Sequence, residues 1–215
     1  MTWDWAFVIK ILPALGIGVW YTVVVTAAAS VIALGLGLAL AIMESVSKTY
    51  GRAFVLFWLE LFRGVPSLVL LYFCFYVLPQ LGVTVPAIPI GIVVLGVVYA
   101  AYCSEVYRGS LITIQGELRD ACVALHLRSY TKWRRILVPL MAQRAAPALL
   151  NYVLSLFRET AVLFAIGVPV LMGEANDIGY EHFRYLEPYT LAGAIYLAMN
   201  LPFLYVLSRF KDKHA

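Results

Sequence analysis

The fold is indicated first by residues 105–144, which read EVYRGSLITIQGELRDACVALHLRSYTKWRRILVPLMAQR. This is the one long polar segment of a mostly apolar chain, and it carries seven basic and three acidic residues. Four of its residues fall at the spacing i, i+3, i+4 and i+7, which places them on one face of a short helix: Leu118, Ala121, Cys122 and Leu125. A small apolar face with a charged rim can dock into a groove on a soluble partner, whereas a basic linker can also lie on anionic lipid headgroups. Both interpretations stay open on these residues alone.

The composition is that of an integral membrane protein. Of 215 residues, 63% are apolar and 13% are charged, against roughly 25% charged residues in a soluble domain. The 16 Lys and Arg residues exceed the 12 Asp and Glu residues, but they gather in a few polar segments. That clustering favours a topological role in a lipid membrane over a nucleic acid partner.

Five apolar stretches of about 15 to 25 residues approach or reach the length that a transmembrane helix needs, so we expect an all-α integral membrane protein with five transmembrane helices. They cover about residues 19–43, 55–78, 90–104, 148–172 and 189–208. Before the first, Trp3, Trp5 and Phe7 with Lys10 predict a short amphipathic segment at the membrane interface. Within the first apolar stretch, the pairs Ala33/Gly37 and Gly35/Ala39 predict close contact with another helix.

The basic residues predict the orientation. With five spans, twelve of the sixteen Lys and Arg residues fall on one side, which is expected to be cytoplasmic. The N-terminus is then outside and the C-terminus inside.

Charged residues within the apolar stretches are the candidate functional groups. Arg158 and Glu159 lie midway along the fourth stretch, where ionisable side chains usually face a bundle interior or an aqueous path. A water-filled path, a partner subunit and a structural pair between helices all fit this position. Glu60 and Arg63, at i and i+3 before Gly64, fit either a local ion pair or a gate.

No motif for independent chemistry is present in the sequence. It contains no phosphate-binding GxxxxGK[ST] loop, dinucleotide fingerprint, HExxH zinc motif or GxSxG elbow. Cys74, Cys103 and Cys122 have neither metal-site nor disulfide-framework spacing and are expected to be packing residues. We therefore expect no catalytic residue, metal or bound cofactor. A transported solute would be driven by an ion gradient, by a partner subunit or by no energy source, and the polar segment favours the partner.

Residues 120–139, DACVALHLRSYTKWRRILVP, resemble the coupling motif of ABC-importer permeases, which reads EAA, three residues, G, nine residues, I-x-L-P. The spacing is intact, and four positions differ from the motif: Asp120, Cys122, His126 and Val138 stand for Glu, Ala, Gly and Leu. The glycine permits a left-handed turn, and histidine is among the less reluctant residues there, so the turn is expected to survive at His126.

Three further runs resemble the polar amino acid permeases, and the resemblance extends from about Gly18 to the C-terminus. AYCSEVYRGSL at 101–111 is similar to AYxAEVxRGGI, FRGVP at 62–66 to FRGTP, and LFRETAVLFAI at 156–166 to LxKDTSLxSxI. Within that group, WDWAF at 3–7 and FRYLEP at 183–188 most resemble permeases for ectoine and hydroxyectoine.

The resemblance implies one MetI-like type I importer domain over residues 1–215, with a coupling segment at about 111–140. Such a subunit works by alternating access in a bacterial inner membrane. It pairs with a second, homologous or identical, permease, receives solute from an extracytoplasmic binding protein, and rests on a cytoplasmic ATPase dimer that hydrolyses ATP. The residues implied in ATPase coupling are Leu118, Asp120, Ala121, Cys122, Leu125, His126 and Pro139. The residues expected along the substrate path are Arg158, Glu159, Thr160, Glu60 and Arg63. An ion-coupled secondary carrier and a non-transporting membrane scaffold are the alternatives.

Overall fold

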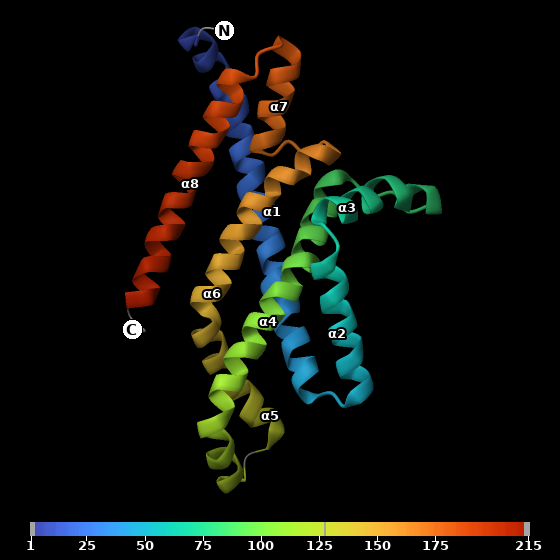
Figure 1. Ribbon diagram of the computed structural model, residues 1–215, viewed down its shortest axis with the longest axis vertical. Coiled ribbons are helices and arrows are strands. Elements are labelled where there is room, and N and C mark those ends of the chain that lie inside the picture. The colour runs from blue at the N-terminus through green and yellow to red at the C-terminus, as the bar shows by residue number, and fades with distance from the viewer. Residues whose placement is uncertain (1–2, 127, 213–215) are drawn as a thin grey trace.

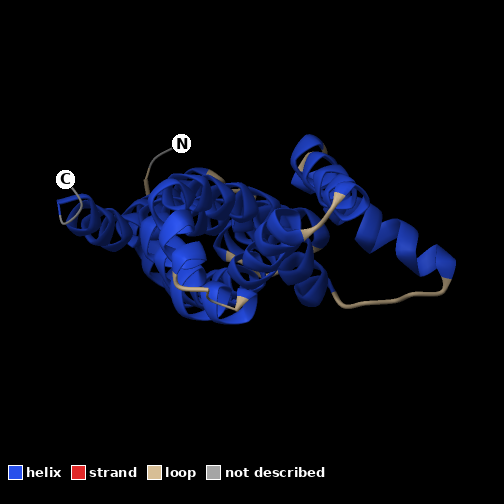
Figure 2. Ribbon diagram, turned by 90° about the horizontal axis from the view of Figure 1, so that it is seen from below, coloured by secondary structure: helices blue, strands red, loops and turns tan. Residues whose placement is uncertain are grey.

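A computed structural model describes residues 3–126 and 128–212, without the side chains of 115–124, 203–204 and 206–212. Every regular element in this part of the chain is helical (Figure 2), as the hydropathy pattern predicted. In chain order the elements are α1 (Trp5–Val46), α2 (Thr49–Gly64), α3 (Ser67–Tyr72), η1 (Phe73–Val77), η2 (Leu78–Leu81), α4 (Ala87–Ala124), α5 (Ser129–Lys132), η3 (Trp133–Leu137), α6 (Val138–Glu159), η4 (Thr160–Ile166), α7 (Leu171–His182) and α8 (Leu186–Asp212).

The long helices run alongside one another in alternating directions (Figure 1). From the end that holds the N-terminus, α1, α4 and α8 run toward the opposite end, and α2 and α6 run back. The turn between α4 and α5 lies at that opposite end, whereas α7 lies near the N-terminus. The segment that contains α3 projects sideways from the bundle.

The contact between α1 and α4 is the largest helix interface, and small residues make it close. Ala33 and Gly37 are buried there. A Cβ atom on Gly37 would lie 2.8 Å from Cys103 Cβ and 2.9 Å from the Ala100 carbonyl oxygen, which leaves no room for a side chain. Gly35 lies on another face, with nothing within 4 Å of such a Cβ. The expected small-residue contact therefore uses the Ala33/Gly37 pair within this subunit.

Replacing Gly37 with leucine is expected to destabilise the protein by about 1–3 kcal/mol, because overpacking forces the two backbones apart. Gly35→Leu introduces the same side chain on an open face of the same helix and serves as the control. Thermal denaturation of both variants in detergent would measure the difference. Equal midpoints would show that the α1–α4 contact is not limited by the space at Gly37.

Four expected boundaries are corrected by the structure. Residues 5–18 belong to α1 and form no separate interfacial segment, since the Asp4 side chain caps the helix and Pro13 does not end it. The second stretch is broken at Gly64–Pro66, where the chain bends by 98°. The third continues to Ala124, because no proline follows Pro89 in the first turn of α4. The fourth begins at Val138 and its α-helix ends at Glu159, where a 3₁₀ segment leads to Gly167 at φ 75°.

Within the described residues, three helical stretches are long and apolar enough to cross a membrane: Trp5–Val46, Ala87–Ile114 and Ser129–His182. The bent pair Thr49–Gly64 and Ser67–Leu81 would be a fourth if it forms one span. The count of five remains a prediction.

Candidate functional site

A cavity of about 310 Å³ lies where the break between α2 and α3 meets α4 and the end of α6. Polar side chains from separate elements reach it: Arg63 from α2, Ser67 from α3 and Glu159 from α6. The remaining lining residues are Val65, Pro66, Val98, Tyr99, Tyr102, Tyr152 and Ser155. The break at Gly64–Pro66 is what brings the end of one helix and the start of the next to the same wall.

Glu159 is the only acidic residue among those that line the cavity. It is the last residue of α6, and a carboxylate at a helix C-terminus is disfavoured by the helix dipole. The Ser67 hydroxyl donates a hydrogen bond to Glu159 Oε1 across 92 positions of sequence. This bond holds the carboxylate against α3 and fixes the position of the negative charge in the cavity wall.

Arg63 is the cationic counterpart, in the last turn of α2. Its Nη2 lies 2.8 Å from Glu60 Oε1, and its Nη1 lies 3.7 Å from Glu105 Oε1 on α4. The ion pairs of Arg63 thus go to these two residues and not to Glu159. The cavity therefore presents one positive and one negative group on different helices.

Tyrosine rings form the aromatic wall of the cavity. Tyr102 of α4 stacks on Tyr152 of α6 with ring centroids 5.5 Å apart, and Tyr99 lies 5.8 Å from Tyr102. These rings offer flat apolar surface with hydroxyl groups at the edge.

The five residues expected along the substrate path lie in different environments. Glu159 and Arg63 line the cavity, whereas Arg158 does not, because its guanidinium bonds back to the Leu154 carbonyl and the Ser155 hydroxyl. Thr160 is buried and donates to the Phe157 carbonyl oxygen at 2.6 Å. Glu60 is 77% exposed and reaches the site only through Arg63. Their roles in transport stay predictions.

The lining residues that sequence reasoning missed are Ser67 and the three tyrosines. Ser67 directly follows the FRGVP run and Tyr102 lies within the AYCSEVYRGSL run, so both are adjacent to or within motifs that indicated the family. Tyr99 and Tyr152 had no such signal.

The expected ATPase-coupling residues surround the turn that follows α4. Leu118, Asp120, Ala121 and Cys122 belong to the last turns of α4, and their side chains lie outside the described part. Leu125 is 70% exposed, and His126 has φ 45°, which is the left-handed conformation that the glycine of the motif permits. Pro139 lies in the first turn of α6, where its missing N–H is tolerated. The coupling role itself stays a prediction.

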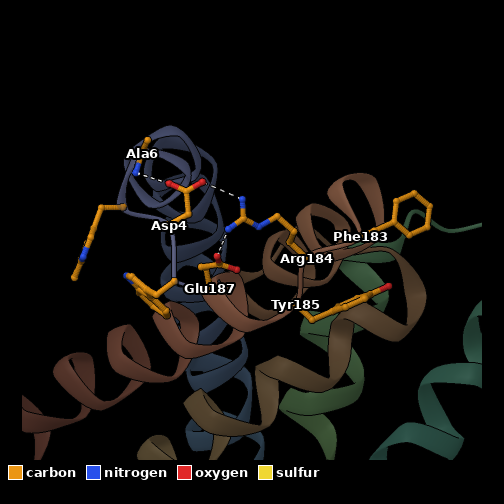
Figure 3. Close-up of a pocket in the computed structure, with 8 residues that line it drawn as sticks. Asp4, Ala6, Phe183, Arg184, Tyr185 and Glu187 are labelled. Carbon is orange, nitrogen blue, oxygen red and sulfur yellow. Dashed lines mark hydrogen bonds and ion pairs between the residues drawn. The ribbon is translucent and has the colours of Figure 1, made fainter. Parts of the chain in front are cut away.

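A second, larger cavity of about 600 Å³ lies at the N-terminal end of the bundle (Figure 3). Arg184 donates to Asp4 Oδ2 at 3.1 Å and also to Glu187, so it joins the start of α1 to the start of α8. Its guanidinium carbon lies 4.5 Å from the centroid of the Phe7 ring. The cavity is lined by Trp3, Asp4, Trp5, Ala6, Phe183, Arg184, Tyr185 and Glu187.

This ion cluster is expected to withstand mild acid. The hydrogen bond from Arg184 is the largest influence on Asp4, and with the backbone N–H of Phe7 it holds the pKa of Asp4 below its ordinary value. A lowered folded pKa means that the contribution is complete above about pH 3.9, the usual aspartate value, and is lost as the pH falls through the folded value. Hydrogen exchange of the Ala6 and Phe7 amides, corrected for intrinsic rates, should be constant from about pH 7 to 5 and should accelerate only below about pH 4. Asp4→Asn keeps a capping side chain but loses the charge, so its protection should lack that transition. A transition between about pH 5 and 6 in the unmodified protein would contradict the assignment.

Apolar helices long enough to cross a bilayer surround a half-exposed cavity with one acidic and one basic side chain, an arrangement compatible with a membrane permease. Among the described residues, no group of three or more His, Cys, Asp or Glu could hold a metal. Residues 32–213 match the family described as "Binding-protein-dependent transport system inner membrane component", and the chain belongs to that family. It is a permease subunit of an ABC importer, whose ATPase is a partner chain.

Individual relatives support this assignment. The chain is 32% identical to the probable amino-acid ABC transporter permease protein y4tG of Sinorhizobium fredii, over 93% of this chain and 89% of that one. It is 26% identical to the glutamine transport system permease protein GlnP of Escherichia coli, over 80% and 81%. A solved structure titled "Crystal structure of an amino acid ABC transporter with histidines" has a TM-score of 0.90 at 29% identity and covers 99% of this chain and 100% of that one.

Proposed function

We propose that this chain is the permease subunit of an importer for a polar amino acid or an amino-acid-like compatible solute. The observation that carries the proposal is the placement of Glu159 and Arg63 in one cavity on different helices. A zwitterion can bind there with its ammonium group toward Glu159 and its carboxylate toward Arg63, as charge-assisted hydrogen bonds are the strong ones. The tyrosine rings would cover the apolar part of the solute.

The relatives narrow the solute to amino acids and their derivatives. GlnP is named for glutamine and the solved transporter for an amino acid, which supports a solute with an α-ammonium and an α-carboxylate group. The finer proposal is ectoine or hydroxyectoine, which are also zwitterions. It rests on WDWAF and FRYLEP, two runs that are far apart in sequence. The Asp4–Arg184 contact brings them together at the cavity of about 600 Å³ at the N-terminal end of the bundle (Figure 3).

The assembly that we propose contains two permease chains with five spans each, a cytoplasmic ATPase dimer and an extracytoplasmic solute-binding protein. The chain would lie in a bacterial inner membrane with its N-terminus outside. The turn at His126 would then face the ATPases, and the cavity bounded by Asp4 and Arg184 would face the binding protein. The turn after α4 and the cavity at the start of α1 lie at opposite ends of the bundle, which supports placing them on opposite sides of the membrane (Figure 1).

The test has two stages. The tagged chain is first purified from detergent-solubilised membranes, and the co-purifying chains are identified by mass spectrometry. An ATPase with a second permease would indicate a heterodimer, and an ATPase alone a homodimer.

The complex is then reconstituted into proteoliposomes with its binding protein, and uptake of labelled glutamine, histidine, arginine and ectoine is measured with and without ATP. Uptake that needs an ion gradient but no ATP would refute the proposal in favour of a secondary carrier.

A further inference from the structure

Six charged side chains of alternating sign form a continuous series that begins near the turn between α1 and α2. The series reaches the cavity lined by Arg63 and Glu159, which we refer to as the solute cavity. We refer to the six side chains as the charge ladder: Arg52, Glu44, Arg108, Glu105, Arg63 and Glu60. They come from three helices, since Glu44 belongs to α1, Glu105 and Arg108 to α4, and the remaining three to α2. The last cation of the series, Arg63, is also a lining residue of the cavity.

Exposure to solvent falls from the ends of the ladder toward its middle. The ends, Arg52 and Glu60, are 60% and 77% exposed, the side chains of Arg108, Arg63 and Glu105 are 35%, 27% and 26% exposed, and that of Glu44 is 5% exposed. Charge interactions are stronger where solvent is excluded, and exposed ion pairs contribute little. The contacts that join α1, α4 and α2 through Glu44, Arg108 and Glu105 are therefore expected to be stronger than those at the exposed ends of the ladder.

The contacts within helices are short and the contacts between helices are long. Arg108 lies 2.6 Å from Glu105 within α4, and Arg63 lies 2.8 Å from Glu60 within α2. In contrast, Arg108 lies 3.8 Å from Glu44, and Arg63 lies 3.7 Å from Glu105. The interhelical links thus have room to shorten when the helices move, while the links within each helix are already closed.

Glu44 shows that one such link is incomplete in this conformation. Its Oε2 atom is buried and has no hydrogen-bond partner among the described residues. Beside it lies a cavity of about 220 Å³ that is also lined by Arg52 and Arg108. A buried carboxylate oxygen without a partner is unfavourable, so a sliding movement of α4 along α1 that completes the bond to Arg108 would be favoured.

We propose that the charge ladder transmits movement of the far end of α4 to Arg63 in the solute cavity, with Glu105 and Glu44 as positioning residues. α4 is one continuous helix that carries both Glu105 and, 15 residues further along at Asp120, the segment that resembles the ATPase-coupling motif. A displacement of α4 therefore moves Glu105 and Arg108 together. Glu105 then draws or releases Arg63, and Arg108 closes or opens its contact with Glu44. This inference rests on the proposed function, because Arg63 is assigned there to the solute.

The double variant E105R/R108E tests the ladder with little change in composition. It keeps the i, i+3 ion pair within α4 and the net charge, but it places arginine against Arg63 and glutamate against Glu44. In the reconstituted complex, we expect solute transported per ATP hydrolysed to fall about tenfold, within the usual range for coupling between sites. Subunit stoichiometry and the ATPase rate without solute should remain at the unmodified level. K10Q, which alters an exposed cation on the outer part of α1, is the control and should transport normally.

A cycle of neutral variants covers the case in which the inverted pair fails to assemble. E44Q and R108Q are measured singly and together, and their effects on transport per ATP should be non-additive because the two residues share one contact. Additive effects, or normal coupling in E105R/R108E, would overturn the ladder while the unmodified complex still transports. Failure of the unmodified complex to transport any zwitterion with ATP would instead overturn the proposed function.

Discussion

Replacement of Glu159 with glutamine is expected to raise the solute concentration for half-maximal uptake by about 10- to 150-fold. Loss of a hydrogen bond to a charged group costs about 1.5–3 kcal/mol, and each 1.36 kcal/mol corresponds to a factor of ten. Glutamine has nearly the same shape, and its amide oxygen can still accept the hydrogen bond from Ser67. The change therefore removes the charge and leaves the wall of the cavity in place.

The measurement is the initial rate of ATP-dependent uptake into proteoliposomes as a function of solute concentration. Glu181→Gln removes the same charge from an exposed position on α7 and should leave the half-saturating concentration unchanged. A shift of less than about threefold in Glu159→Gln would show that the ammonium group of the solute is bound elsewhere, because it would fall well below the expected loss.

Substitution of Cys122 with tryptophan is expected to abolish solute-stimulated ATPase activity without reducing membrane insertion. α4 continues to Ala124 and turns at His126 with φ 45°, so Cys122 lies in the last turn before the reversal. The corresponding position of the coupling motif holds alanine, and a large indole ring there would prevent a groove on the ATPase from closing over the helix end.

Cys122→Ala restores the residue of the motif and is the matched control, for which stimulation should be at least that of the unmodified chain. The comparison requires the ATPase rate with and without solute-loaded binding protein, together with the amount of permease in the membrane. Full stimulation in Cys122→Trp would mean that the ATPase does not contact α4 at this position.

Much of the fold followed from the sequence, but helix ends did not. The apolar stretches predicted an all-helical bundle, whereas the bend of 98° at Gly64–Pro66 depends on how α3 packs on its neighbours. The polar residues after Ser104 predict that the third stretch ends there, whereas α4 continues to Ala124. A helix needs no apolar side chains where it leaves the membrane, so polarity alone does not mark its end.

The candidate site was predictable in its chemistry but not in its geometry. Arg158 and Glu159 are adjacent in sequence, and neighbouring side chains point about 100° apart on a helix. Only one of them could face a given cavity, and the rotation of α6 about its axis, which the sequence does not specify, selects Glu159. The hydrogen bond between Ser67 and Glu159 could likewise not be predicted, because it depends on the bend between α2 and α3. His126 was anticipated because its conformation is a local backbone property.

The length of α4 has a mechanical consequence. At 1.5 Å per residue, its 38 residues extend about 57 Å, whereas the hydrocarbon core of a bilayer is about 30 Å thick. A helix of this length can act as a stiff lever. The arm from Glu105 to Ala124 measures roughly 28 Å by the same rise, and its first part, as far as Ile114, is packed in the core. A tilt of about 10° would swing the tip by roughly 5 Å on that arm. The same tilt would move groups near Glu105, where the lever pivots, by only a fraction of that distance. A large movement of the proposed ATPase would therefore produce only small displacements near the binding site.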